Sequence, residues 1–156
     1  MLEVECKLTK SGRLLNNSMP KYCVIQALNL IKPKKYKDLR ITLLGLAFRG
    51  GVSDTRLSPT YDVIKELQKL KVKEIIVHDP LVKKDDHFSK HTNIVLVNDL
   101  DVALKGADLI MVIADHEEYK NLNGKKIENS VLYDGRGIIL EDKFRGVNHS
   151  MIGNIN

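Results

Sequence analysis

The spacing of hydrophobic residues predicts a helix ahead of residue 40. Val24, Leu28 and Ile31 recur at helical intervals, and Pro20 stands where a first helical turn accepts a proline. The pattern therefore predicts an amphipathic helix over residues 20–31, with Val24, Leu28 and Ile31 packed either inside the domain or against a partner. The residues before it alternate weakly, as a strand does, at Leu2, Val4, Cys6 and Leu8.

From residue 40 onward, short apolar runs alternate with helical patterns. Strands are expected at 41–44, 75–77, 93–97, 109–114 and 130–133, and helices after Ser58-Pro59, at 99–105 and at 116–122. Strands separated by helices predict a parallel sheet that is covered on both faces. We expect an α/β protein with a Rossmann-like parallel sheet of about five strands, preceded by one helix.

Ligands of such sheets bind beyond the carboxyl ends of the strands, near the point where the strand order reverses. The loops that follow Leu44, Val77, Ala114 and Tyr133 are therefore the candidate binding loops. Asp79, directly after the second strand, is placed either to bond a ribose or to cap the turn into Pro80.

Composition and charge narrow the class of protein. The chain has 156 residues and a net charge of +5, and nine of its 25 basic but only three of its 20 acidic side chains lie in residues 1–40. Since this basic stretch has no stacking aromatic residue beyond Tyr36, a solvated linker is favoured over a nucleic-acid contact. No apolar run reaches the length of a membrane helix, and no signal-peptide pattern opens the chain, so we expect a soluble, cytoplasmic protein.

A glycine-rich segment follows the first strand. Residues 45–50, GLAFRG, fit the relaxed pattern GxAxxG, and the loop continues to Leu57 with Arg49 and Arg56 on it. Glycine at such a turn allows backbone N–H groups to approach a phosphate, and arginine suits phosphate geometry. By itself the pattern fits a plain tight turn equally well.

Several segments together resemble one enzyme family. In chain order they are 12–20 (GRLLNNSMP), 41–59 (ITLLGLAFRGGVSDTRLSP), His78-Asp79-Pro80, Lys105-Gly106-Ala107-Asp108 and Asp134-Gly135-Arg136. They resemble the end of the central helix and the C-terminal, UDP-binding domain of the UDP-sugar 6-dehydrogenases, the UDP-glucose/GDP-mannose dehydrogenase family. The resemblance implies that residues 1–39 are the end of the central dimerisation helix with a basic linker, and that residues 40–156 are the UDP-sugar-binding domain.

The resemblance also implies roles for five residues. Phe48, Arg49 and Arg136 occupy positions that bind the UDP-sugar, with arginine at 49 in place of the usual lysine. Arg56 occupies a position that reaches NAD, and Arg13 one that extends into the sugar site of the partner subunit. Leu57 replaces a common glutamate, which leaves the orientation of Arg56 open.

Two further segments point to one branch of the family. Residues 115–119 (DHEEY) and 144–147 (FRGV) resemble segments of relatives that act on N-acetylated UDP-hexosamines. The substrate implied is therefore UDP-N-acetylmannosamine or UDP-N-acetylglucosamine rather than UDP-glucose.

The family's catalytic cysteine loop and NAD-binding domain have no counterpart in the sequence. Cys6 lacks the surrounding glycines and Lys-Asp pair, so we predict no catalytic residue and a chain that is inactive alone. NAD is implied as the cofactor of the complete enzyme and is not expected to bind this chain. His87 and His91, with Asp85 and Asp86 nearby, are interpreted as a polar loop rather than a metal site.

Two functions follow from the sequence. The first is a portion of an NAD-dependent UDP-sugar dehydrogenase, with a UDP-sugar as ligand, an N-terminal NAD-binding half as partner, and a homodimer formed through the N-terminal helix. The second is a stand-alone, non-catalytic nucleotide-sugar-binding module. Neither involves nucleic acid, a membrane or a metal.

Overall fold

The computed structural model describes residues 6–31, 35–88, 90–140, 144 and 147–153. The helical elements are α1 (Lys7–Asn29), η1 (Tyr36–Asp38), α2 (Pro59–Lys69), α3 (Leu100–Leu104), α4 (Glu117–Lys120) and η2 (Gly124–Ile127). The strands are β1 (Arg40–Leu44), β2 (Glu74–His78), β3 (Ile94–Val97), β4 (Leu109–Val112), β5 (Val131–Asp134) and β6 (Asn148–Met151).

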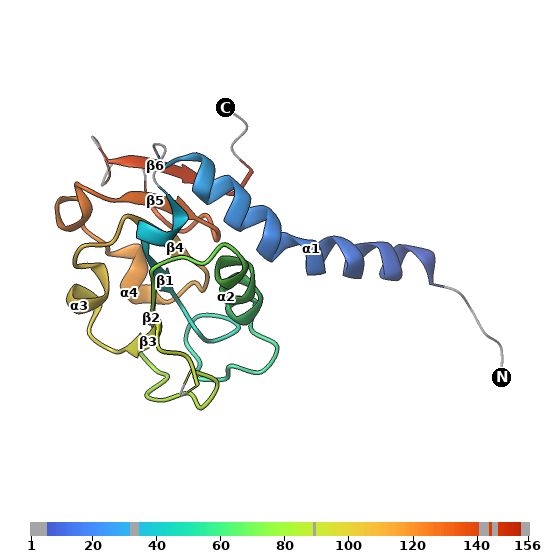
Figure 1. Ribbon diagram of the computed structural model, residues 1–156. Coiled ribbons are helices and arrows are strands. Elements are labelled where there is room, and N and C mark those ends of the chain that lie inside the picture. The colour runs from blue at the N-terminus through green and yellow to red at the C-terminus, as the bar shows by residue number, and fades with distance from the viewer. Residues whose placement is uncertain (1–5, 32–34, 89, 141–143, 145–146, 154–156) are drawn as a thin grey trace.

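The strands form one sheet in the order β3-β2-β1-β4-β5-β6, and every neighbouring pair is parallel (Figure 1). This confirms the Rossmann-like α/β architecture. The sheet has six strands, whereas the sequence predicts about five. The additional strand is β6, which has the sequence NHSM and pairs only with β5. A polar edge strand has no apolar run from which the sequence could predict it.

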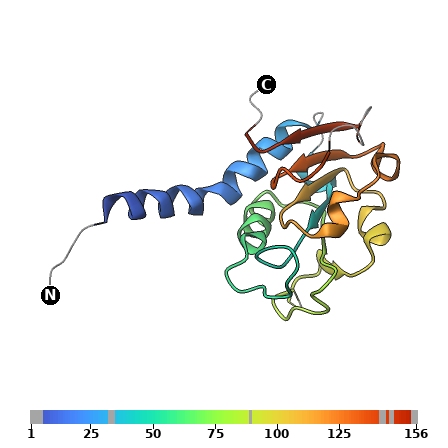
Figure 2. The same ribbon diagram turned by 180° about the vertical axis from the view of Figure 1, so that it is seen from behind.

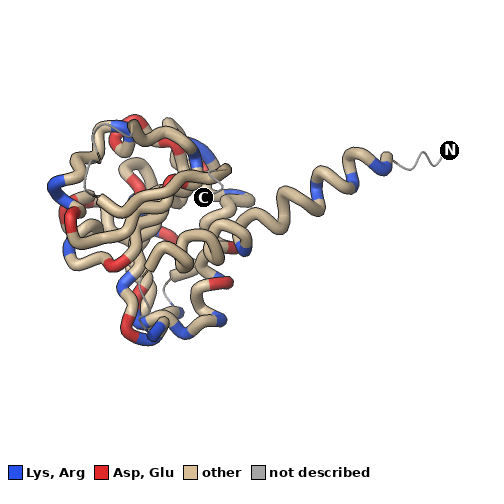
Figure 3. Tube along the Cα trace, turned by 90° about the horizontal axis from the view of Figure 1, so that it is seen from above, with Lys and Arg blue, Asp and Glu red and all other residues tan. Residues whose placement is uncertain are grey.

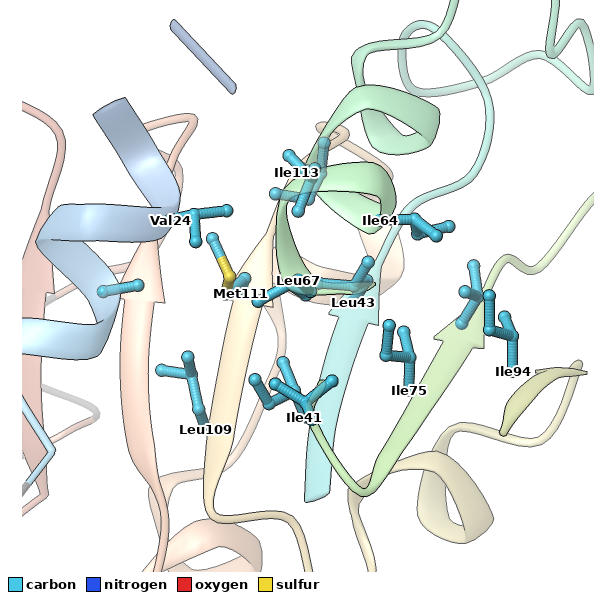
Figure 4. Packing of buried hydrophobic residues seen from close by; sticks show 14 of the residues in the cluster. Val24, Ile41, Leu43, Ile64, Leu67, Ile75, Ile94, Leu109, Met111 and Ile113 are labelled. Atoms are coloured by element: carbon cyan, nitrogen blue, oxygen red, sulfur yellow. The ribbon is translucent and has the colours of Figure 1, made fainter. Parts of the chain in front are cut away.

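Helices cover both faces of the sheet, as expected. Successive strand residues point to opposite faces, so they contribute to two hydrophobic clusters, one on each face. On one face, Ile41 and Leu43 of β1 pack with Val24 of α1 and Leu67 of α2 (Figure 4). On the other face, Leu44 of β1 packs with residues of α3, α4 and η2, including Leu104, Tyr119 and Ile127.

The N-terminal helix is longer than predicted. It begins at Lys7 and passes through Pro20, so the prediction that it starts at Pro20 is wrong. The strand-like pattern is also wrong at Leu8, which is helical, while Leu2 and Val4 lie outside the described residues. Pro20 is buried, and packing of the helix around it offsets the backbone hydrogen bond that a proline removes.

The two halves of α1 have different surroundings. Val24 is buried in the sheet-facing cluster, and Leu28 and Ile31 pack against that cluster, so these three residues pack inside the domain. Residues 6–18 are all exposed, and this half extends away from the sheet (Figures 1 and 2). Its charged residues within the described part, Lys7, Lys10 and Arg13, are all basic (Figure 3).

The chain order reverses at the middle of the sheet. The chain runs outward from β1 through β2 to β3, and then returns to the other side of β1 as β4. The carboxyl ends of β1 and β4 therefore form the switch point at which doubly wound sheets bind ligands. None of the helices within the described ranges has the length and apolar composition that a membrane crossing requires.

Candidate nucleotide-sugar site

The loop that follows β1 begins with a glycine whose replacement would strain the backbone. Gly45 has φ +107°, and a Cβ atom there would lie 2.4 Å from Cβ of Ala114, beyond the end of β4. The loop then runs to Ser58, whose hydroxyl accepts a hydrogen bond from Thr60 N–H and caps α2, as predicted. The glycine therefore allows the loop to pass directly against the segment that follows β4.

Asp79, at the end of β2, holds the start of this loop. Its carboxylate is fully buried, and Oδ2 accepts hydrogen bonds from the N–H groups of Leu46 (2.8 Å) and Ala47 (2.9 Å). Oδ1 accepts from the N–H groups of Leu81 and Val82, which close the turn after β2. Asp79 is thus a structural cap rather than a ribose ligand, and the N–H groups of Leu46 and Ala47 are not free for phosphate.

The charge of Asp79 is stabilised where it is buried. Burial would raise the pKa of Asp79. His116 and the backbone N–H groups that donate to Asp79 outweigh this effect and hold the pKa well below its usual range. Nε2 of His116 lies 3.2 Å from Oδ2 of Asp79, a polar contact whose angles fall short of a hydrogen bond. His116 Nδ1 also accepts from Gly51 N–H at 3.4 Å, so it contacts the glycine-rich loop as well.

Asp115 joins two of the candidate loops. Its Oδ1 accepts a hydrogen bond of 2.8 Å from Gly50 N–H and one of 3.3 Å from Nη2 of Arg136. The bond from Gly50 is the largest cause and lowers the pKa of Asp115; burial opposes it, and Arg136 adds a smaller lowering effect. The glycine-rich loop and the loop after β5 therefore meet at one carboxylate.

The loop after β5 presents Arg136. Asp134, nearly fully buried, accepts hydrogen bonds from the N–H groups of Arg136, Gly137 and Ile139. Gly135 lies so close to β4 that a Cβ atom there would be 2.8 Å from the carbonyl oxygen of Val112. The Asp-Gly-Arg sequence thus forms a tight turn that leaves the guanidinium of Arg136 at the surface.

Phe48 and Arg49 lie on the exposed part of the glycine-rich loop. The Phe48 ring is exposed, and Cζ of Arg49 lies 5.6 Å from its centroid, within the range of a cation–π contact. The loop that carries them also carries Gly50, which is bonded to Asp115. The structure therefore places Phe48, Arg49 and Arg136 on loops that meet at the switch point.

Arg56 forms a separate, local pair. Its Nε and Nη2 both donate to the carboxylate of Asp54, which lowers the pKa of Asp54 to about 2. The next residue, Leu57, has φ +58° and a side chain that is 95% exposed. A leucine in this conformation costs about 1 kcal/mol relative to a glycine.

Arg13 and the cysteines all belong to the N-terminal segment, and among the described residues no polar contact joins them to these loops. Arg13 is in the exposed, extending half of α1, and Cys6 precedes the same half. Cys23 is buried, and burial raises the pKa of its thiol. Neither cysteine is part of the candidate site.

The histidine-rich segment after β2 does not gather metal ligands. Nδ1 of His87 pairs with Asp85 at 2.9 Å, whereas Nδ1 of His91 lies 3.1 Å from the side chain of Gln68. In the described ranges, no group of three or more His, Cys, Asp or Glu residues is arranged to hold a metal ion.

The sequence points to candidate arginines but not to the residues that connect their loops. Asp115 and His116 belong to the DHEEY segment, and only the fold shows that they accept hydrogen bonds from the N–H groups of Gly50 and Gly51. The available signal was their position: two polar residues follow the most apolar strand directly, at the sheet edge where ligands bind.

A doubly wound parallel sheet with a glycine-rich turn and arginine-bearing loops at its switch point defines a nucleotide-binding domain of the Rossmann type. Residues 42–141 match the sequence model of the UDP binding domain of the UDP-glucose/GDP-mannose dehydrogenase family. The chain belongs to this family.

Relatives and solved structures agree with this assignment. The UDP-N-acetyl-D-mannosamine dehydrogenase of Methanocaldococcus jannaschii is 35% identical over 138 residues, which are 88% of this chain and 29% of that protein. The NDP-N-acetyl-D-galactosaminuronic acid dehydrogenase of Methanosarcina mazei superposes with a TM-score of 0.83 at 25% identity, over 99% of this chain and 33% of that one.

The UDP-N-acetyl-mannosamine dehydrogenase of Staphylococcus aureus superposes with a TM-score of 0.77 at 29% identity, over 97% of this chain and 35% of its own. The chain thus spans about a third of the length of the relatives that it matches.

Proposed function

We propose that this chain binds the UDP moiety of a UDP-sugar at the carboxyl ends of β1, β4 and β5, through Phe48, Arg49 and Arg136. The observation that carries the proposal is the meeting of the glycine-rich loop and the Asp-Gly-Arg loop at Asp115, inside the segment that matches the UDP binding domain. Two arginines on these loops provide the paired donors that phosphate oxygens prefer.

The activity that we propose for the complete protein is NAD-dependent oxidation of the primary alcohol of a UDP-N-acetylhexosamine to a carboxylate. The names of the most similar relatives support this substrate class. In this proposal a separate NAD-binding half supplies the cofactor site and the catalytic cysteine, and Arg56 approaches NAD from this chain. This chain alone is expected to produce no NADH, and a cytoplasmic location stays a prediction.

We also propose that α1 forms a homodimer. Leu8, Leu15 and Tyr22 are seven residues apart, so they form one stripe along the helix, and all three are exposed. Arg13 lies in the same half of α1, where it would reach a site in the second subunit. An arginine that acts in the site of a second subunit has a role in a dimeric dehydrogenase and little use in a stand-alone nucleotide-sugar-binding module. Arg13 therefore favours the first function.

The test is calorimetric titration of the chain with UDP, UDP-N-acetylglucosamine, UDP-glucose and NAD, each alone. We expect the UDP ligands to bind and NAD not to bind. Replacement of Arg136 by alanine should weaken UDP binding at least about tenfold, since hydrogen bonds between charged groups contribute about 1.5–3 kcal/mol.

Lys65→Ala is the matched control. It removes one positive charge from an exposed position on α2, where Lys65 pairs with Asp62, and should leave UDP affinity unchanged. UDP binding that survives Arg136→Ala, or no UDP binding at millimolar concentration, would contradict the proposed site. Mixing the chain with the NAD-binding half of a relative and assaying NADH distinguishes the enzyme from the stand-alone module.

A further inference from the structure

One oxygen atom of Asp115 accepts hydrogen bonds from two donors that suit phosphate. Oδ1 accepts from Gly50 N–H, on the glycine-rich loop, and from Nη2 of Arg136, on the Asp-Gly-Arg loop. A backbone N–H of a glycine-rich loop and a guanidinium are both groups that proteins use to bind phosphate. A carboxylate of the protein itself therefore lies among the groups that would bind a ligand's anion.

The two bonds differ in how easily they exchange. The bond from Gly50 is 2.8 Å long, and the backbones are packed so closely that a Cβ atom on Gly50 would lie 2.2 Å from the carbonyl oxygen of Asp115. Asp115 is therefore fixed to the glycine-rich loop.

The contact with Arg136 is looser. It is 3.3 Å long, and the two side chains are 38% and 41% exposed. Within the described residues it is the single polar contact of this guanidinium, so most of the Arg136 donors have no protein partner there. Ion pairs with this degree of exposure are weak and are readily replaced.

We propose that Asp115 is a built-in competitor for the ligand's phosphate: its carboxylate holds Arg136, and a phosphate of the nucleotide takes its place at Arg136 while Asp115 stays bonded to Gly50. This inference rests on the proposed function. Asp115 then weakens nucleotide binding in two ways, because Arg136 must leave a partner and because the carboxylate stays near the phosphate and repels it.

The opposite role would be a positioning residue that orients Arg136 for the ligand. The two roles differ in sign. If Asp115 competes, removing its charge strengthens nucleotide binding; if it orients Arg136, removing its charge weakens binding.

The experiment is titration of Asp115→Asn with UDP. Asparagine keeps an oxygen that accepts from Gly50 N–H and removes only the charge. We expect UDP to bind about three- to fivefold more tightly, the upper part of the range that exposed ion pairs contribute. Asp115→Ser, whose hydroxyl also accepts from Gly50, should change affinity in the same direction, and thermal unfolding establishes that each variant is folded.

Asp101→Asn is the matched control, because it removes one negative charge from an exposed residue of α3 that pairs with Lys126. Its UDP affinity should equal that of the wild type. The gain in Asp115→Asn should also shrink as ionic strength rises from about 0.01 M to about 1 M, where the Debye length falls from ~30 Å to ~3 Å.

A double-mutant cycle locates the effect at Arg136. In an Arg136→Gln background, Asp115→Asn should give a clearly smaller gain, because no guanidinium is left for the carboxylate to hold. Unchanged or weaker UDP binding by folded Asp115→Asn would overturn the inference and leave the proposed function standing. Failure of the wild-type chain to bind UDP would instead overturn the proposed function, and the inference with it.

Discussion

At the scale of single residues, buried polar side chains hold the candidate site in shape. Asp79 accepts four backbone hydrogen bonds from two loops, and Asp134 accepts three from the loop that presents Arg136. Both carboxylates are buried, so a backbone N–H that lost its carboxylate partner could not hydrogen-bond to water instead. Their contribution is therefore to loop geometry and stability.

Replacing Asp79 by asparagine should destabilise the fold. An amide has one accepting oxygen instead of two and presents an NH2 group to backbone N–H donors. We expect a loss of about 2–4 kcal/mol in the free energy of unfolding, measured by urea denaturation. Asp101→Asn, on the surface, should change it by less than about 0.5 kcal/mol. Equal stabilities of the two variants would contradict the role assigned to Asp79.

His78 should make stability depend on pH. Its side chain is buried, with Nδ1 2.9 Å from the hydroxyl of Tyr119. Burial lowers the pKa of His78 below its model-peptide value of 6.5, with partial opposition from the charge of Glu118. The unfolded chain therefore binds this proton more readily than the folded chain does, and stability falls as pH decreases below 6.5.

Urea denaturation at several pH values between about 8 and about 5 tests this prediction. His78→Gln should show a flatter dependence of unfolding free energy on pH over that range. His91→Gln, at an exposed position, should follow the wild type. The effect of Asp79 is separate, because its carboxyl in the unfolded chain takes up a proton only near the usual value of 3.8. A slope that persists in His78→Gln would show that another group is responsible.

At the scale of elements, the glycine-rich loop packs on the segment that follows β4. Gly50 and Gly51 are adjacent and differ in the reason for glycine. A Cβ atom on Gly50 would meet backbone atoms of Asp115 and His116 within 2.7 Å, whereas one on Gly51 would meet nothing within 4 Å. Gly51 instead has φ +75°, which disfavours other residues by conformation alone.

Gly50→Ala should therefore be more damaging than Gly51→Ala. We expect Gly51→Ala to cost about 1 kcal/mol of stability, the usual cost of a left-handed conformation. Gly50→Ala should cost more, about 2 kcal/mol or above, and should weaken UDP binding because the loop must move away from Asp115. Thermal unfolding and calorimetry of the two variants check this order, and a reversed order would contradict the packing argument.

The elements themselves could largely be predicted from the sequence. Five strands and the helix capped by Ser58 follow from apolar runs and capping residues, which act over a few positions. The sixth strand could not be predicted, because NHSM becomes a strand only by pairing with β5. The predicted start of α1 at Pro20 is wrong because a proline favours a helix start locally, and packing overrides that preference here.

At the scale of the whole molecule, the extending half of α1 is the main feature that the fold leaves without a partner. Leu8, Leu14 and Leu15 are exposed there, and within the described residues they do not join either hydrophobic cluster. Exposed apolar stripes of this kind mark interaction surfaces. The proposed homodimer covers them with the same surface of a second copy.

Leu15→Lys should convert the proposed dimer into a monomer, because it places a charge in the middle of the stripe. Light scattering coupled to size-exclusion chromatography measures the change. Asn17→Lys adds the same charge about 200° around the helix from Leu15 and should remain dimeric. The proposal fails if the wild-type chain is monomeric at every concentration, or if both variants behave alike.

The sequence by itself determined the fold class and the glycine-rich turn, because these depend on local periodicity and on residue types at fixed spacing, and its motifs make the arginines at 49 and 136 candidates for the site. Only the tertiary structure decided that Asp79 caps the glycine-rich loop, and that Asp115 joins Gly50 to Arg136. These contacts connect residues 21 to 65 positions apart. Parallel strands return to the same sheet edge after each helix, so the sheet, not the local sequence, brings such residues together.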